Sequence, residues 1–233
     1  APYDSGTFAS TGTVVAGKAV ALAAAALRVN ILDFASRHLG VDKSDCRIEG
    51  DSVICGDLQV GLSELHAAGT GVGHRFEAKR KAYLSPRSVA FNVHAVRVAV
   101  HRVTGEIRIL HSVHAADIGR PINPMQCRGQ LDGAITMGYG WVLTENMVHD
   151  EGHMVNAQLR NYRIPAWADA PRTDLFLAGT VDTIGPLGAK SQGECAINPV
   201  APAVSNALAN ATGVRFAHLP FTPDRLFAKL ATS

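Results

Sequence analysis

Cysteine is scarce and unpatterned in this chain of 233 residues: four are present, and no Cys-x-x-Cys or zinc-type His/Cys spacing occurs. A disulfide framework and a structural zinc site are therefore excluded, and the thiol usage leans toward a reducing compartment. Long apolar runs are also lacking, because Gly17 and Lys18 interrupt the Ala-rich residues 14–27. We accordingly expect no membrane span and no signal peptide.

Several common signatures are absent as well. The sequence contains neither a Walker loop nor a Gly-x-Gly-x-x-Gly after a strand, and it lacks the Gly-x-Ser-x-Gly elbow of serine hydrolases. His111 and His114 fall on opposite faces of one predicted strand, which argues against a shared metal. Charge is nearly balanced, with 22 Lys and Arg against 20 Asp and Glu. We interpret the basic residues in 75–81 as a solvated sheet face and expect no nucleic-acid binding.

The composition, 47% hydrophobic and 18% charged, is that of a globular protein and excludes a disordered chain. Residues 14–39, rich in Ala and Leu and closed by Gly40, predict a long and mostly buried helix. Alternating and β-branched residues predict strands at 74–84, 88–103 and 106–118. Because helices and antiparallel strands mix without a regular β-α-β alternation, the predicted fold class is α+β.

A tight hairpin is predicted around Gly50 and Asp51, which form a two-residue loop and set Cys46 opposite Cys55. This pair is of the non-hydrogen-bonded kind, in which the backbones approach closely, so a cross-strand disulfide is sterically feasible. Two buried thiols on a core face are the favoured interpretation, and the disulfide is the alternative.

Asn-Pro pairs mark helix starts in the second half of the chain. They predict helices over about 124–143 and 199–211, and a last helix begins near Thr222. The first of these contains four glycines, which indicates close approach of another backbone or of a ligand. Shorter elements are expected at three places: a hairpin around 150–152, a strand near 175–181 and a strand at 214–219.

Three segments of small, hydroxyl or amide residues lead into helix starts or line them. They lie at residues 6–13, at Asn123 with residues 129–130, and at residues 185–194. Helix N-termini offer free backbone donors and a positive dipole end, so several of them together would cradle an anionic ligand such as a pyrophosphate-bearing cofactor. Each segment taken alone is better explained by ordinary capping and turns.

Glu194 is the acidic residue that best fits the role of a catalytic base. It follows Gly193, precedes the uncharged residues 195–197, and has Lys190 four positions before it. We therefore expect a largely desolvated site. From composition alone, a structural or solvated glutamate is the favoured interpretation, and a carboxylate that takes and returns protons is the alternative. Cys195 is interpreted as a small buried hydrophobe rather than as a reactive thiol.

Together these segments resemble the C-terminal region of the molybdenum-binding large subunit of the xanthine dehydrogenase and aldehyde oxidase family. Residues 3–13 read YDSGTFASTGT and resemble the family's pterin-contacting stretch. Residues 117–124 read DIGRPINP and residues 129–133 read GQLDG, which resemble its Asp-x-Gly-x-x-Ile-Asn-Pro and Gly-Gln-x-x-Gly signature. Residues 188–194 read GAKSQGE and are similar to the loop that carries the family's active-site glutamate.

The resemblance implies a site and a fold. By it, Glu194 is the active-site base, and the pterin is held by Gly6, Ser10, Thr13, Gln130, Lys190 and Gly193. The implied fold is that of the family's second molybdopterin-binding domain, with mixed helices and antiparallel or mixed sheets. It extends over residues 1–233, with a sub-division expected near 1–120 and 121–233. The sequence departs from the family pattern at Thr11, where relatives often carry Arg, and at Cys195, where many carry Pro.

The implied reaction is oxidative hydroxylation, in which oxygen from water enters an electrophilic carbon of an aldehyde or N-heterocycle. The implied cofactor is a molybdenum-pyranopterin in the form of molybdopterin cytosine dinucleotide, with no protein side chain bound to the metal. Iron–sulfur clusters and FAD are expected on other domains or subunits. The enzyme is expected to be cytoplasmic, with the periplasm as the alternative.

The resemblance covers only the last portion of the family's subunit. We therefore expect this chain to be a fragment, inactive alone, that assembles with the N-terminal half of the molybdenum subunit. Iron–sulfur subunits, flavin or cytochrome subunits and a small-molecule substrate are its further expected partners. The alternative is a non-catalytic module of a split subunit, which contributes half a cofactor cradle and an interface. A small-molecule binding protein with a repurposed cradle ranks below both.

Overall fold

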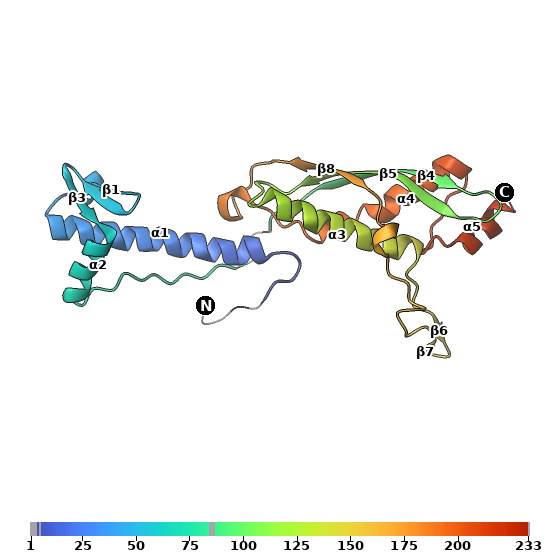
Figure 1. The fold of residues 1–233 in the computed structure, drawn as a ribbon, viewed down its shortest axis with the longest axis horizontal. Helices are drawn as coiled ribbons and strands as arrows, with labels where there is room; N and C mark the ends of the chain where they lie inside the picture. Colours follow the sequence, from blue (N-terminus) through green and yellow to red (C-terminus); the bar gives the residue numbers. More distant parts are fainter. Residues whose placement is uncertain (1–3, 5, 84–86, 233) are drawn as a thin grey trace. The chain divides into compact units, whose positions relative to one another are not determined.

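The structure is a computed structural model that describes residue 4, residues 6–83 and residues 87–232. It divides into two compact units, which we call unit 1 (Ala1–Thr13 and Pro86–Ser233) and unit 2 (Val14–Ser85) (Figure 1). The units therefore do not divide near residue 120, because the strand before that position and the helix after it share one core. Helices combined with small antiparallel and mixed sheets confirm the α+β class.

Unit 2 combines helices with a small antiparallel sheet. Helix α1 (Gly12–Leu39) ends at Gly40, whose φ of 68° is the left-handed C-terminal cap that the sequence predicts. The following elements are η1 (Lys43–Asp45), β1 (Cys46–Glu49), β2 (Ser52–Cys55), β3 (Leu58–Gly61) and α2 (Leu62–Gly71). The predicted hairpin register is confirmed, since Cys46 pairs with Cys55.

Helix α1 is less buried than expected. Its C-terminal part packs into the core of unit 2 through Leu32, Phe34 and Ala35, whereas Val20 and Val29 remain 67% and 46% exposed. The Ala- and Leu-rich composition predicts a helix without defining which face packs, so the expected burial is wrong along most of its length. By length and composition α1 is also apolar enough to cross a membrane, contrary to our expectation, a property shared with core helices and signal sequences.

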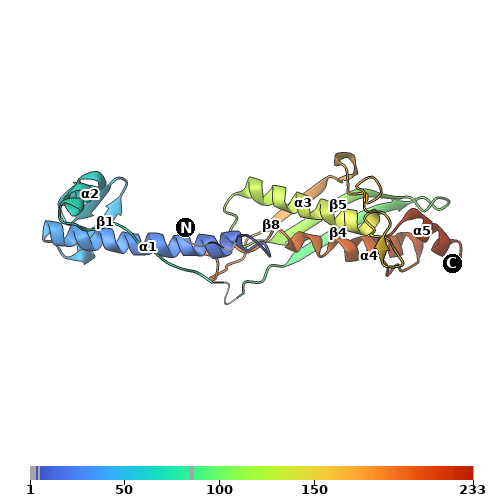
Figure 2. The same cartoon turned by 90° about the horizontal axis from the view of Figure 1, so that it is seen from below.

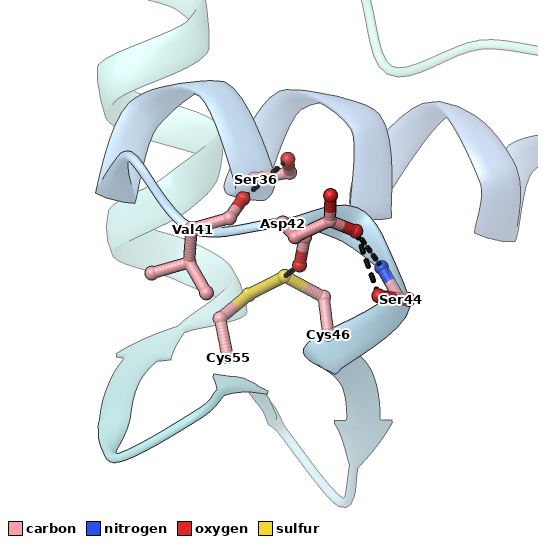
Figure 3. Close-up of a disulfide and its surroundings, with 6 residues drawn as sticks. All are labelled: Ser36, Val41, Asp42, Ser44, Cys46 and Cys55. Carbon is pink, nitrogen blue, oxygen red and sulfur yellow. Dashed lines mark hydrogen bonds between the residues drawn. A yellow bond between two sulfur atoms is a disulfide. The ribbon is translucent and has the colours of Figure 1, made fainter.

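Cys46 and Cys55 form a disulfide between β1 and β2 (Figure 3). The favoured interpretation as two free thiols is therefore wrong, because the directly opposed register brings the two Cα atoms to 4.0 Å. Both residues lie in the small core of unit 2. In the turn before β1, the side chain of Ser44 donates a hydrogen bond to the carboxyl of Asp42, and the backbone N–H of Ser44 donates a second one. Both bonds lower the pKa of this carboxyl, the side-chain bond more strongly.

Residues 74–83 form no strand, so that prediction is wrong, and Leu84 lies outside the described residues. A side chain of α1 binds this segment instead: Asn30 Nδ2 donates to the carbonyl of Arg75 at 3.2 Å, and Asn30 Oδ1 lies 2.8 Å from His74 Nε2. The basic residues in 75–81 are therefore not on a sheet face. Strand β3 and helix α2 are elements that the sequence analysis did not predict.

Unit 1 contains a three-stranded sheet in the order β4-β5-β8. Strands β4 (Asn92–Val100) and β5 (Ile107–Asp117) form the predicted hairpin, and β8 (Thr173–Ala178) lies parallel to β5. Helices α3 (Pro124–Leu143) and α4 (Val200–Thr212) run alongside this sheet and share its core (Figure 2). The remaining elements are β6 (His149–Asp150), β7 (His153–Met154), η2 (Trp167–Asp169), η3 (Pro186–Gly188), η4 (Cys195–Ile197) and α5 (Pro223–Leu230).

The predicted helix ends of unit 1 are largely confirmed. Asn123 caps α3 by accepting a hydrogen bond from the backbone of Gln126, and Gly213 ends α4 in the left-handed conformation. One glycine of α3 allows the close approach that its composition indicates. A Cβ at Gly138 would lie 2.6 Å from Cγ2 of Val200, so α3 and α4 touch there.

The strand predicted at 214–219 is wrong. Ser205 Oγ donates to the carbonyl of Phe216 and Lys229 Nζ donates to the carbonyl of Arg215, each at 2.8 Å. Side chains from α4 and α5 therefore form hydrogen bonds with backbone carbonyls that a neighbouring strand would otherwise bind, although the residue pattern of this segment is that of a strand.

Candidate functional site

The three segments predicted to cradle a ligand converge on one cleft of about 800 Å³ in unit 1. They are the residues before and at the start of α1, the N-terminus of α3, and the loop between β8 and α4. The cleft is lined by Thr7, Ser10, Gly12, Thr13, Ile118, Arg120, Pro121, Ile122, Asn123, Gln126, Cys127, Gly129, Gln130, Ala189, Lys190, Gln192 and Gly193.

The first wall is a strained turn. Thr11 N donates to the carbonyl of Phe8, and the two residues between them, Ala9 and Ser10, have φ angles of 49° and 53°. Positive φ at both central positions is the pattern of a type I′ turn, which usually takes Gly or Asn. Each non-glycine residue costs about 1–2 kcal/mol in this conformation. Ser191 of the facing loop offsets the strain, because its Oγ binds the carbonyls of Ala9 and Ser10 at 3.1 and 2.9 Å.

Gly193 is the point where the three segments meet. A Cβ at this position would lie 2.9 Å from Ser10 Oγ and 3.2 Å from Gln130 Oε1. The absence of a side chain lets the loop approach both neighbours this closely without displacing them. The structure thereby brings together three of the residues that the sequence singles out.

Glu194 binds the same serine. Its backbone N–H donates to Ser10 Oγ at 2.9 Å, and Ser10 Oγ donates to Glu194 Oε2 at 3.1 Å. The side chain is exposed, so the expectation of a largely desolvated carboxylate is wrong for this chain. The reason is local: Ala196, two residues later in the tight turn η4, points into the core with 0% exposure, and Glu194 therefore faces away from it.

Lys190 lines the cleft, but its ammonium binds protein groups. Lys190 Nζ lies 2.8 Å from Asp117 Oδ2 and 3.0 Å from the carbonyl of Val89, and both charged side chains are 9% exposed. Burial alone would raise the pKa of Asp117, but hydrogen bonds from Lys190, from Thr180 Oγ1 and from Gly119 N outweigh it and lower that pKa. The pair fixes the loop to the end of β5, which is a positioning role.

Of the other residues predicted to hold the cofactor, one lines the cleft and one does not. Thr13 lines the cleft, whereas Gly6 does not, and its backbone N–H donates to Asp4 Oδ1 at 2.8 Å. Ser191 and Gln192 also contribute to the site, and the sequence does not single them out within the segment 185–194. Neither carries a signal beyond being a polar residue inside the Gly-rich loop, because their roles depend on which segment faces them in the fold.

The donor set of the cleft fits a large, anionic, hydrogen-bonding group. None of the described residues that line it is acidic. Within the described residues, the guanidinium of Arg120 has no hydrogen-bond or ion-pair partner. Gln192 Oε1 is buried and, in the same part of the chain, also lacks a partner. A buried amide oxygen in this state usually indicates a ligand or water that completes it.

Histidines do not add a metal site to unit 1. The described residues contain no group of three or more His, Cys, Asp or Glu side chains that could hold a metal ion. His111 is exposed and binds Asp174, whereas His114 is fully buried, so the two lie on opposite faces as predicted. Cys195 is half-buried, and burial followed by the charge of Glu194 raises the pKa of its thiol.

Comparison with known proteins finds related sequences. The model of the molybdopterin cofactor-binding domain matches residues 1–171. The probable hypoxanthine oxidase XdhD of Escherichia coli (strain K12) is 33% identical over 98% of this chain, which covers 24% of that protein. The aldehyde oxidoreductase molybdenum-binding subunit PaoC of Escherichia coli O157:H7 is 32% identical over 87% of this chain, which covers 28% of that protein.

Two solved structures share the fold. Quinoline 2-oxidoreductase from Pseudomonas putida 86 superposes with a TM-score of 0.85 and 28% identity over 98% of this chain. The Cu,Mo-CO dehydrogenase superposes over the whole chain with a TM-score of 0.86, and at 24% identity this shows the fold alone. The chain covers 31% of each of these structures and 24% and 28% of the two curated relatives.

Proposed function

Since the chain belongs to the molybdopterin cofactor-binding domain family, in the C-terminal part of xanthine dehydrogenase and aldehyde oxidase molybdenum subunits, we propose that it supplies the cofactor cradle and the catalytic base of a molybdenum hydroxylase. The observation that carries this proposal is the convergence at Gly193, which lines the cleft with Ser10 and Gln130 and directly precedes Glu194. Such a convergence of small and polar residues suits a large cofactor approached by backbone.

The cofactor we propose is a molybdenum-pyranopterin in its cytosine dinucleotide form. When bound, it supplies the redox chemistry and the activated oxygen that the side chains of this chain lack. Thr13, Gln130 and the loop at Gly193 would hold it, with Gln192 Oε1 as an unused acceptor and Arg120 as an unpaired cation for its phosphates. Lys190 would act on the cofactor only by holding the loop in place.

Glu194 is the proposed base, since it follows Gly193 directly and binds Ser10, and both of these residues line the cleft. Ionised, it accepts a proton at Oε1 or Oε2, and its exposure leaves it open to a substrate or water. The proposed reaction is hydroxylation of an aldehyde or an N-heterocyclic carbon, with water as the oxygen source. Two relatives, a probable hypoxanthine oxidase and the molybdenum-binding subunit of an aldehyde oxidoreductase, support both substrate classes.

The proposed assembly includes more chain than these residues. We propose that the N-terminal part of the molybdenum subunit completes the site, and that iron–sulfur and flavin or cytochrome subunits remove the electrons. The Cys46–Cys55 disulfide favours the periplasmic alternative over the cytoplasm, because disulfides persist mainly in oxidising compartments.

The first experiment is elemental analysis of the protein purified natively with the chains that accompany it. We expect stoichiometric molybdenum together with iron-bearing partners. A fully assembled native complex free of molybdenum would contradict the hydroxylase proposal and favour a non-catalytic assembly module.

The second experiment replaces the proposed base. Glu194→Gln in the assembled enzyme should leave molybdenum content unchanged and reduce turnover by at least about 10²-fold, as for a lost general base. Hypoxanthine and benzaldehyde with ferricyanide as acceptor are the probes, and Glu151→Gln, an exposed glutamate in the β6–β7 turn, is the matched control. Turnover near that of the unmodified enzyme in Glu194→Gln would remove Glu194 from the mechanism.

A further inference from the structure

We propose that Ser10 is a positioning residue for Glu194, a role that rests on the proposed function of this glutamate as the base. One hydroxyl binds both ends of the same residue: Ser10 Oγ accepts from the Glu194 backbone N–H at 2.9 Å and donates to Glu194 Oε2 at 3.1 Å. The two residues are 184 positions apart in the sequence. The bond therefore ties the carboxylate to its own backbone through a distant segment, which limits rotation of the glutamate side chain.

The position of this hydroxyl is set by backbone structure. Ser10 stands at a left-handed φ of 53° in the turn of residues 8–11, and Ser191 Oγ binds the carbonyls of Ala9 and Ser10. Gly193 lets the loop approach until a Cβ would lie 2.9 Å from Ser10 Oγ. A strained turn held by its neighbours at a candidate active site is the arrangement expected where geometry serves function.

The direction of the hydrogen bonds decides what Ser10 can do. A serine hydroxyl carries one proton, and here that proton is donated to the carboxylate of Glu194. One lone pair receives the Glu194 N–H, so a single acceptor position remains for any ligand. Ser10 therefore cannot donate to the cofactor while it holds Glu194. This assignment differs from the expectation that Ser10 serves as a pterin donor.

The donated bond also holds the carboxylate in one orientation, because the Ser10 hydroxyl donates and a carboxylate oxygen accepts. Among the described residues, no ion pair between Glu194 and a cation competes with this bond. Ser10 is thus the side chain that keeps Glu194 oriented.

The test uses two variants that remove the hydroxyl in different ways. Ser10→Ala leaves a side chain at the strained backbone position, whereas Ser10→Gly also relieves the left-handed strain. Thr11→Val is the matched control, since among the described residues its hydroxyl binds only the carbonyl of Phe8 in the same turn, at 2.9 Å. All variants are made in the enzyme purified with its native partners, and molybdenum content and thermal unfolding establish that each one is assembled.

Two readouts are expected to respond. Hydrogen exchange at the Glu194 amide should accelerate about fivefold in both Ser10 variants, because this N–H loses its acceptor. With hypoxanthine or benzaldehyde as probe, kcat should fall by about 10- to 100-fold while KM stays within about twofold, because the base is misoriented rather than absent. Thr11→Val should leave both values near those of the unmodified enzyme.

Each outcome decides the inference. Unchanged exchange at Glu194 in Ser10→Ala overturns it whether or not a probe is turned over. A rescue of kcat by Ser10→Gly, or an equal loss in Thr11→Val, would show that the strain or rigidity of the turn matters and not the hydroxyl. Loss of activity in Glu194→Gln with full activity in Ser10→Ala defeats this inference alone. Full activity in Glu194→Gln defeats the proposed function, while the exchange result still judges the contact between Ser10 and Glu194.

Discussion

Among the single residues of the site, the thiol of Cys195 is sensitive to the charge of Glu194. Burial and then the negative charge of Glu194 raise the pKa of this thiol. Glu194→Gln removes the second cause and should lower the thiol pKa, so that more thiolate is present at pH 8 and alkylation by iodoacetamide is faster. Peptide mass spectrometry separates Cys195 from Cys127, whose alkylation rate serves as the internal reference. An unchanged Cys195 rate would mean that the carboxylate does not face the thiol.

The Lys190–Asp117 pair should behave as a buried structural contact. Removing one partner leaves an uncompensated charge at a position that is 9% exposed. Lys190→Met in the intact protein should therefore lower the free energy of unfolding by about 3–5 kcal/mol in urea titration. Lys43→Met breaks the exposed pair with Asp33 and should cost about 1 kcal/mol or less. Equal effects of the two variants would contradict the positioning role of Lys190.

These residues show what a motif does and does not predict. The sequence indicates three segments of small, hydroxyl or amide residues at helix starts, and in the structure Ser10, Gln130 and Gly193 from these segments lie together at the cleft. It does not indicate which group each side chain binds. The ammonium of Lys190 goes to Asp117, and the hydroxyl of Ser10 goes to Glu194. Partners this far apart in sequence are defined only by the fold.

At the scale of elements, a buried polar network joins the sheet of unit 1 to α3. His94 Nδ1 lies 2.9 Å from His114 Nδ1, and His114 Nε2 lies 3.0 Å from Asn92 Oδ1. Because the amide oxygen only accepts, His114 carries its proton on Nε2 and accepts from His94 Nδ1–H. His94 Nε2 then accepts, and it lies 3.2 Å from Ser112 Oγ and 3.0 Å from Tyr139 Oη, either of which can donate to it. This arrangement has one ring proton on each histidine, as in the neutral form.

Acid should therefore loosen this core. Burial lowers the pKa of both histidines to about 4, and for His94 the neighbouring His114 adds to the effect. Since the folded pKa lies below the unfolded value of about 6.5, the stabilisation is complete above pH 6.5 and is lost as the pH falls toward 4. We expect the melting temperature of unit 1 to drop over this range. A His94→Gln/His114→Gln variant should show a shallower drop, whereas exposed His111→Gln should keep the original slope.

Whole elements were predictable where composition and caps agree. Asn-Pro and glycine signals place α3 and the end of α4, and the Gly50–Asp51 turn fixes the register of β1 with β2. The failures are extended segments. Residues 74–83 and 214–219 have a strand-like pattern, but side chains from neighbouring helices bind their backbones. A local pattern records that a segment is extended and does not record which partner completes it.

At the scale of the whole molecule, the described chain has two separate cores. The core of unit 1 is built on α3, α4 and the β4-β5-β8 sheet, and it carries the candidate cleft. The core of unit 2 is smaller, with eight buried residues that include both halves of the disulfide. Small cores of this kind often depend on a covalent cross-link. Closing a loop with a sequence separation of 9 is expected to stabilise unit 2 by about 2–3 kcal/mol.

Two treatments should therefore act on different parts of the protein. A ligand bound to unit 1 stabilises the residues around the cleft by mass action, by about 4 kcal/mol at a thousandfold excess over its dissociation constant. Enzyme produced without molybdate should show faster hydrogen exchange at residues 8–13, 118–130 and 186–197 and unchanged exchange at 46–61. Dithiothreitol should instead accelerate hydrogen exchange at residues 46–61 and leave exchange around the cleft unchanged. Reduction removes the only disulfide among the described residues, which lies in unit 2. A change in both units under either treatment would show that the two cores unfold together. The prediction that the two units are stabilised independently would then be wrong.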